Sequence, residues 1–309
     1  MIGTRSARLL RSRTATARIL TSLIAVALLS SCLTPPNTTE PSPSPSPTVS
    51  SGPTRPRLEL SHYEYALQTK GKIRVAVRDA SAPYSARTAG NSYEGFEPDL
   101  AREIAKAIWG TTDDPESHIT WISVDDSTSD QADITLAGLI VAVIDAAPFD
   151  FTDAYYTDGQ RLLVKKTNDQ IKELVDVAGG DQTVAAVKDS RSEQNLRLLT
   201  NARAKILPLD TVAFCLQALT SGAADAFTAD EATLVSVVMK DPALKIATKQ
   251  FTNDRVAIAV KKNVSADRQG FREFLNTALL KIVADRTWAR IYDKWVGPIT
   301  GEKKQLPTD

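Results

Sequence analysis

The 309-residue chain is poor in the side chains on which most catalytic and metal sites depend. It has two histidines, His62 and His118, and two cysteines, Cys32 and Cys215, and neither histidine is near a cysteine in the sequence. HExxH, GxSxG and P-loop runs are also absent, which excludes the enzyme classes that these motifs mark. Cys215 lies on an apolar helical face, where a cysteine is usually a small buried hydrophobe. We therefore expect no cofactor and no metal, and an enzyme is the least favoured class.

Long hydrophobic runs are missing as well. The apolar stretch Ile19–Leu29 is shorter than the about 20 residues that a membrane-spanning helix needs. A basic segment, residues 1–18, precedes it and Leu29-Ser30-Ser31-Cys32 follows, an order that predicts a secretory signal over residues 1–31. This ending resembles the lipobox of bacterial lipoproteins, which implies cleavage before Cys32, acylation of its thiol and anchoring to the cell membrane. The alternative is a secreted protein in which Cys32 is incidental.

An excess of charge of either sign is also lacking, since 37 basic side chains balance 37 acidic ones. Five of the basic residues are arginines of the predicted signal, which contains no acid, so the remainder has 32 basic and 37 acidic residues and a net charge of −5. A mildly acidic protein repels the phosphates of nucleic acids. We expect no nucleic-acid partner.

Residues 32–58 lack large apolar side chains, with few exceptions, and are rich in proline, serine and threonine. Such a composition cannot bury a core, so we expect an extended tether of partly polyproline conformation. At about 3.1 Å per residue, the tether would hold the folded part well away from a membrane.

One stretch, Phe149–Lys166, determines how we expect the folded part to be divided. In Phe149–Lys166, β-favouring residues are interrupted by Thr157-Asp158-Gly159, a turn-competent break within an extended run. This pattern is typical either of a hinge strand that leaves one lobe for another or of a hairpin within one domain. A second extended run, Asp254–Lys262, favours the hinge, because it could return the chain to the first lobe.

Strand and helix patterns alternate through the folded part, which indicates an α/β fold. Strands are predicted at 72–78, 119–124, 132–139, 181–187 and 224–229, and helices at 190–204, 211–219, 231–239, 268–284 and 287–295, with a further helix that begins near Pro98 and stops at Gly110. Residues 79–93 are predicted to be a loop at the carboxyl end of the first strand, where open α/β sheets place their ligands.

Five short segments are informative because of their order and spacing along the chain. They are GFEPDLAREIA from Gly95, ADITLAG from Ala132, FDFTDAYY with LLVKK from Phe149, ALTSGAADAFTADEATL from Ala218 and DRTWARIYDKWVG from Asp285. With them, roughly residues 71–298 resemble the extracellular solute-binding proteins that capture polar amino acids for ABC importers, the glutamine-binding type.

The resemblance implies a two-lobed, type II periplasmic-binding-protein-like fold with two hinge strands. Lobe 1 is expected at 59–156 and 255–309, and lobe 2 at 157–254. The resemblance also implies a monomer that holds a small-molecule ligand in the interlobe cleft, with an ABC permease or a membrane sensor as its partner.

A cleft of this kind needs a cation for the α-carboxylate, an anion for the α-ammonium group and aromatic walls that exclude water. Asp230 matches the family's ammonium-binding aspartate, although an aspartate after a strand is equally typical of a helix N-cap. The family's Thr-x-Thr-x-x-Arg run is replaced by LIVAVID from Leu139, and Asp145 stands where the arginine would. The Gly-Thr-Thr-Ser loop is replaced by Asp189-Ser190-Arg191-Ser192, and the connection 125–130 is several residues shorter.

These departures leave two interpretations. In the first the ligand has changed: Arg191 supplies the cation from the other lobe, or Asp145 and Asp230 together favour a cationic ligand such as a polyamine. In the second the lobes serve docking or sensing without a tight ligand. Arg78 and Tyr84 border the predicted cleft loop, and the candidate ligand-binding set also includes Ser190, Ser192 and Leu139. Some relatives of the fold are dehydratases that use acidic residues, which keeps catalysis as a third and least favoured alternative.

Overall fold

The computed structural model describes residues 62–110, 114–125, 128–141, 148–262, 270–304 and 306. The predicted signal, the tether, Cys32 and Asp145 lie outside these ranges. Among the described residues, no helix combines the length and the apolar character that crossing a membrane requires.

The first of two five-stranded sheets has the strand order β5-β1-β6-β13-β7. Its strands are β1 (Ile73–Arg78), β5 (Ile119–Val124), β6 (Ile134–Thr135), β7 (Phe149–Asp158) and β13 (Asp254–Lys261). β1 runs parallel to β5 and β6, whereas β13 runs antiparallel to β6 and β7. The late strand β13 thus lies between strands from the first half of the chain, so both halves of the chain build this lobe.

The second sheet has the order β10-β9-β11-β8-β12. Its strands are β8 (Gln160–Lys165), β9 (Thr183–Val187), β10 (Lys205–Leu209), β11 (Ala226–Asp230) and β12 (Leu244–Ile246). β9 runs parallel to β10 and β11, whereas β8 runs antiparallel to β11 and β12. Leu162, Leu163 and Val164 of β8 are fully buried, which explains why this central strand reads as an unbroken apolar run.

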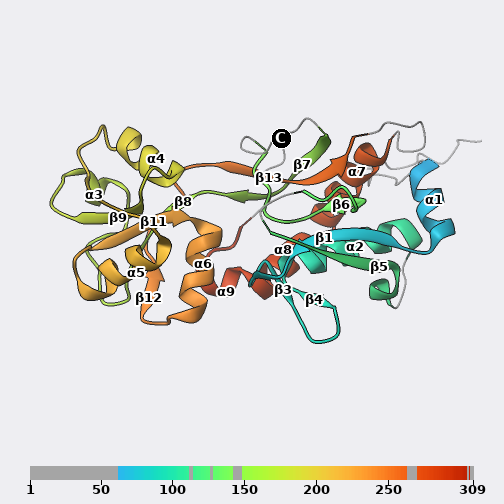
Figure 1. Cartoon of the computed structure of the whole chain (residues 1–309), viewed down its shortest axis with the longest axis horizontal. Helices are drawn as coiled ribbons and strands as arrows, with labels where there is room; N and C mark the ends of the chain where they lie inside the picture. The colour runs from blue at the N-terminus through green and yellow to red at the C-terminus, as the bar shows by residue number, and fades with distance from the viewer. Residues whose placement is uncertain are drawn as a thin grey trace, which may run out of the picture. The chain divides into compact units, whose positions relative to one another are not determined.

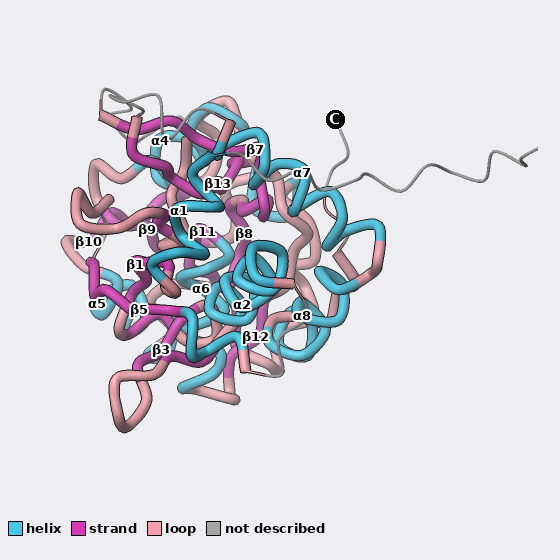
Figure 2. Tube along the Cα trace, turned by 90° about the vertical axis from the view of Figure 1, so that its right-hand side faces the viewer, coloured by secondary structure: helices cyan, strands magenta, loops and turns pink. Residues whose placement is uncertain are grey.

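Helices cover both sheets. In the first lobe they are α1 (His62–Lys70), α2 (Phe96–Trp109), the 3₁₀ helix η1 (Pro115–His118), α7 (Phe271–Ala284), α8 (Thr287–Trp295) and α9 (Gly297–Thr300). In the second lobe they are α3 (Val175–Ala178), α4 (Arg191–Leu199), α5 (Val212–Ser221) and α6 (Glu231–Lys240). Figure 2 shows α2, α7 and α8 gathered on one side of β1 and β5, where their apolar faces share one core with β1.

Side-chain caps begin the longer helices of the second lobe. Ser190 Oγ accepts from the Glu193 N–H at 3.2 Å, Thr211 Oγ1 from the Phe214 N–H at 3.2 Å and Asp230 Oδ1 from the Thr233 N–H at 2.7 Å. Each cap satisfies a backbone donor that has no partner within its own helix. The N-cap interpretation of Asp230 is therefore confirmed.

Two crossings join the lobes, and together we call them the hinge. β7 passes directly into β8 at Asp158-Gly159-Gln160, and residues 247–253 return the chain from β12 to β13. Figure 1 shows β7 and β13 side by side, with β8 continuing from β7 into the second sheet. A Cβ atom on Gly159 would lie 2.2 Å from the Thr252 carbonyl oxygen, so only glycine fits at this close approach of the two crossings. The predicted two-lobed α/β fold with two hinge strands is confirmed.

Three local predictions were wrong. The strand predicted at 132–139 contains only Ile134–Thr135, because Gly138 adopts φ +63° and turns the chain away. The helix predicted at 190–204 ends at Leu199, since residues 201 and 202 both have positive φ and the chain turns into the unpredicted strand β10. The loop predicted at 79–93 contains a small sheet of β2 (Ala80–Ser81), β3 (Ser85–Arg87) and β4 (Tyr93–Glu94).

A buried network of charges ties the C-terminal segment to the hinge. Arg161 of β8, which is 2% exposed, donates to Glu231 Oε2 at 2.6 Å and to Glu302 Oε1 at 2.7 Å. Lys304 Nζ donates to Glu231 Oε1 at 2.9 Å and also to the Thr157 carbonyl. Burial opposes ionisation of Glu231, but Lys304, Tyr156 and Arg161 outweigh it and hold the pKa of that carboxyl below its usual value.

Replacing Arg161 tests how strongly the fold depends on this network. Arg161→Met leaves Glu231 buried with one cation fewer, and we expect a loss of about 3–5 kcal/mol in the free energy of unfolding. Urea titration of the mature chain measures the loss. Arg272→Met is the matched control, because Arg272 pairs with Glu273 at the surface and should contribute less than about 1 kcal/mol. Equal effects of the two substitutions would show that the hinge network does not stabilise the fold.

Candidate ligand-binding cleft

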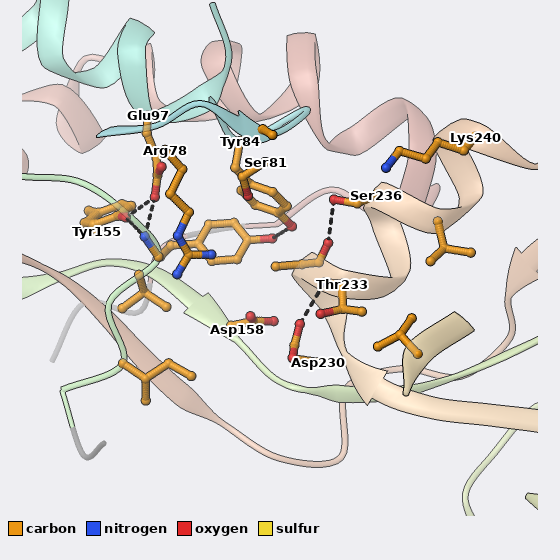
Figure 3. Close-up of a pocket in the computed structure, with 18 residues that line it drawn as sticks. Arg78, Ser81, Tyr84, Glu97, Tyr155, Asp158, Asp230, Thr233, Ser236 and Lys240 are labelled. Carbon is orange, nitrogen blue, oxygen red and sulfur yellow. Dashed lines mark hydrogen bonds between the residues drawn. The ribbon is translucent and has the colours of Figure 1, made fainter. Parts of the chain in front are cut away.

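A cavity of about 490 Å³ lies between the two lobes. The first lobe contributes residues at the ends of β1, α2 and β7, the second contributes α6 from Ala232 to Lys240 and Val212 of α5, and Asp158 contributes from the hinge (Figure 3). Ser236 Oγ of α6 donates to the Ala82 carbonyl at 2.8 Å and so closes one side between the lobes. The volume suits a small molecule.

Arg78 supplies a cation at the carboxyl end of β1. Its Nε donates to the Asp125 carbonyl at 3.1 Å. Its guanidinium lies against Gly138, where a Cβ would come within 3.7 Å of Cζ. Such a distance is ordinary van der Waals contact, so it is the φ of +63° that favours glycine at position 138. Arg78 lines the cavity beside this turn.

Glu97 forms the wall beside Arg78. Its Oε1 accepts from the Tyr155 hydroxyl at 2.5 Å and from the Gly138 N–H at 2.7 Å. Burial raises the pKa of the Glu97 carboxyl, although Tyr155, Arg78 and the Gly138 N–H all oppose that shift. Glu97 thus holds the Gly138 turn in place from the start of α2.

Tyr84 supplies an aromatic wall. Its hydroxyl lies 3.1 Å from the Tyr156 hydroxyl, which in turn donates to Glu231. The first N–H groups of α2 donate to the carbonyls of Pro83 and Tyr84, and a Cβ on Gly95, whose φ is +133°, would lie 2.5 Å from the Tyr84 oxygen. Burial, then the charges of Glu231 and Asp158, raise the pKa of Tyr84 well above its usual value, so its hydroxyl stays protonated.

Two carboxyl groups, those of Asp158 and Asp230, lie side by side at the second-lobe end of the cavity (Figure 3). Asp158 Oδ1 accepts from the Gly159 N–H at 2.7 Å and from the Glu231 N–H at 3.1 Å. Burial, then repulsion by Asp230, raise the pKa of Asp158 to about 7. In the described part of the chain, no group of three or more His, Cys, Asp or Glu side chains is placed to hold a metal ion.

The structure brings only some of the predicted ligand residues to this cavity. Arg78, Tyr84 and Asp230 line it, and Ser190, Arg191, Ser192 and Leu139 do not. Arg191 donates to the Asp254 carboxylate, and Leu139 is packed in a small apolar cluster. Ser190 caps α4, and the Ser192 carbonyl accepts from Gln160 at 2.7 Å.

The cavity residues that were missed from the sequence include two acidic ones, Glu97 and Asp158. Glu97 belongs to the segment GFEPDLAREIA, which was used only as one of the five segments of the family resemblance. Asp158 stands in the middle of the Thr157-Asp158-Gly159 break, which was interpreted only as a turn. The signal for Asp158 was an ionisable residue at the point where one lobe becomes the other, since clefts between domains are common ligand sites.

Comparison with known proteins identifies the family. The family model of bacterial extracellular solute-binding proteins, family 3, matches residues 73–298. The chain belongs to this family. It is 31% identical over 238 residues to the ABC transporter glutamine-binding protein GlnH of Bacillus subtilis (strain 168), a match that covers 75% of this chain and 83% of the relative.

Two solved structures share the fold. The second substrate binding domain of a putative amino acid ABC transporter from Streptococcus pneumoniae Canada MDR_19A has a TM-score of 0.60 and 26% identity, covering 73% of this chain and all of that one. The ancestral cationic amino acid solute binding protein AncCDT-1 has a TM-score of 0.57 and 26% identity, covering 75% of this chain and 98% of that one. The predicted family is thus confirmed.

The raised pKa of Asp158 predicts a specific pH dependence of stability. Between its usual value of 3.8 and about 7, the folded protein holds a proton that the unfolded chain releases, so stability falls as the pH rises through this window. Asp158→Asn keeps the oxygen that accepts from Gly159 and Glu231 and removes the charge. We expect the variant to melt above the native protein at pH 8 and to exceed it by a clearly smaller margin at pH 5, at about 2–4 °C for each kcal/mol. Thermal melts at both pH values measure this, and a pH-independent difference would contradict it.

Proposed function

We propose that the protein is a membrane-tethered extracytoplasmic receptor that captures an amino acid between its lobes and delivers it to the permease of an ABC importer. The observation that carries the proposal is the presence of both charge signs on the cavity wall, where Arg78 offers a cation and Asp158 and Asp230 offer carboxyl groups. An α-amino acid presents a carboxylate and an ammonium group of matching polarity. The name of the Bacillus subtilis relative, a glutamine-binding protein of an ABC transporter, supports the same class of ligand.

Three side chains of the cavity have defined roles in this proposal. Arg78 binds the α-carboxylate, Asp230 binds the α-ammonium group and Tyr84 excludes water from the ion pairs, which gain strength in the lower dielectric of a closed cleft. Arg78 is favoured over Arg191 as the cation, because Arg191 already pairs with Asp254. Asp145 and residues 190–192 remain candidates for contacts that form when the lobes close.

The remaining parts of the chain give this receptor its location. Residues 1–31 are the secretory signal, Cys32 carries the lipid and residues 32–58 form the tether. Lobe 1 comprises 59–156 and 255–309, lobe 2 comprises 157–254, and the protein acts as a monomer.

Binding is favoured over catalysis. The curated relatives are binding proteins. AncCDT-1 is described as a precursor of cyclohexadienyl dehydratase, and catalysis by this chain would appear as turnover of prephenate-like acids, whereas a receptor only saturates. The second alternative, a sensing or docking subunit without a tight ligand, predicts no stabilisation by any amino acid.

Ligand binding by the mature protein tests the proposal. A ligand that binds only the folded state raises the melting temperature by mass action, so at least one proteinogenic amino acid at millimolar concentration should stabilise the protein. Asp230→Asn keeps the N-cap of α6 but removes the charge, and we expect it to weaken binding of that amino acid by at least about 30-fold. Asp176→Asn, an exposed site with the same charge change, should have no effect. If no amino acid shifts the melt, the docking or sensing alternative is favoured.

The lipid anchor has a separate test. We expect Cys32→Ser to abolish labelling by a radioactive fatty acid and to move the protein from the membrane fraction into the medium or periplasm. Cys215→Ser is the control, because its thiol is buried in the folded part. Membrane retention and labelling in the Cys32→Ser variant would show that another segment anchors the protein.

A further inference from the structure

We propose that Asp158 determines ligand specificity by exchanging its proton for a second cationic group of the ligand, so that the cleft selects an amino acid with an ammonium or guanidinium side chain. The inference rests on the proposed function, since it concerns the same cleft, and it adds the substrate class. It assigns to Asp158 a role separate from the α-ammonium contact of Asp230.

The backbone holds Asp158 so that one carboxyl oxygen is available to a ligand. Oδ1 accepts from two N–H groups, those of Gly159 and Glu231. Oδ2 makes no hydrogen bond with any of the described residues, although the side chain is only 6% exposed and lines the cavity. Oδ2 is not one of the fully buried atoms that lack a partner, so it keeps some access to the cavity, and a ligand N–H group there would replace solvent as its partner.

The nearby cations are engaged elsewhere. Lys304 faces Asp158, but its Nζ donates to Glu231 and to the Thr157 carbonyl. Arg161 is enclosed by Glu231 and Glu302. Neither cation therefore balances the charge of Asp158.

The groups that face Asp158 from the packed elements are mainly acidic or neutral. Asp230 and Glu231 face it from the start of α6, and their charges raise its pKa together with burial. Tyr84 lies across the cavity with its hydroxyl protonated. Asp254, opposite Asp158 in the β7–β13 register, is paired with Arg191.

Arg78 and Lys240 are the other cations that line the cavity, and Figure 3 shows them on opposite sides of the two carboxyl groups. The Arg78 Nε donates to the Asp125 carbonyl, and in the proposed function this guanidinium binds the ligand carboxylate. Asp158 and Asp230 place two carboxyl groups beside each other, and a cationic group of the ligand would offset their repulsion.

A proton and a ligand cation compete for Asp158. A zwitterionic amino acid brings one positive group, which Asp230 binds, and Asp158 then keeps its proton. An amino acid with a cationic side chain brings a second positive group. The Asp158 O–H bond breaks, the proton goes to solvent and the carboxylate forms an ion pair with the side-chain nitrogen.

Isothermal calorimetry with arginine, lysine and glutamine measures this exchange. Titrations of the mature protein at pH 6 and pH 8, in buffers of different ionisation enthalpy, give the number of protons released. We expect about one proton on binding of arginine or lysine at pH 6, close to none at pH 8, and none with glutamine at either pH. The affinity for the cationic amino acid should rise about tenfold from pH 6 to pH 8.

Asp158→Asn provides the decisive comparison, because the amide keeps the Oδ1 acceptor and cannot exchange a proton for a cation. We expect arginine affinity at pH 8 to fall by about 10- to 100-fold relative to glutamine affinity, and proton release to disappear. Asp176→Asn, whose side chain is exposed away from the cavity, controls for net charge and should leave all three readouts unchanged.

The outcomes separate this inference from the proposed function. If glutamine binds and arginine binds no more tightly, without proton release, the role of Asp158 is wrong and the receptor function stands. If Asp158→Asn weakens both ligands equally, Asp158 is a positioning residue and the selectivity is wrong. If no amino acid binds at all, both proposals fail.

Discussion

The buried ion pair between Arg161 and Glu231 is the constraint on which the cleft depends. Both side chains are almost fully buried, so each needs its partner to offset the free energy lost on leaving water. Glu231 also fixes the site through its backbone, because its N–H donates to Asp158 Oδ1 and to the Gly159 carbonyl. The charge that anchors α6 to β8 thereby sets Asp158 and Asp230 beside each other.

This arrangement explains how the chain keeps its fold while its ligand contacts diverge. The packing residues of α2, Leu100 and Ile104 among them, face the core of the first lobe and do not line the cavity. The cavity residues instead lie at strand ends and helix starts, such as Arg78 at the end of β1 and Asp230 before α6. Substitutions at such positions change the charge of the cleft without disturbing the core, as is usual for ligand sites on α/β sheets.

The fold was largely predictable because its hinge is local in sequence: the break at Thr157-Asp158-Gly159 and the return run at Asp254 each leave a pattern. Strand pairing that depends on distant residues leaves no such local pattern in the sequence. For this reason β10 and β12 were missed and β6 was predicted too long. The site was harder to predict. Asp230 and Tyr84 stood out by family motif and loop position, whereas Asp158 reaches the cavity only because two distant backbone contacts of Glu231 place it there.

Ionisation of Asp158 is energetically unfavourable before a ligand binds in the cleft. Burial and the neighbouring Asp230 oppose the negative charge, and the hinge network offers no spare cation to relieve it. A ligand shifts a protein between conformations only by the difference in its affinity for them. Lobe closure around a cation lowers the polarity of the surroundings and strengthens its ion pair with Asp158, whereas closure around a neutral side chain leaves the acid dependent on its proton. The same carboxyl group would thus couple the charge of the ligand to the closure of the lobes.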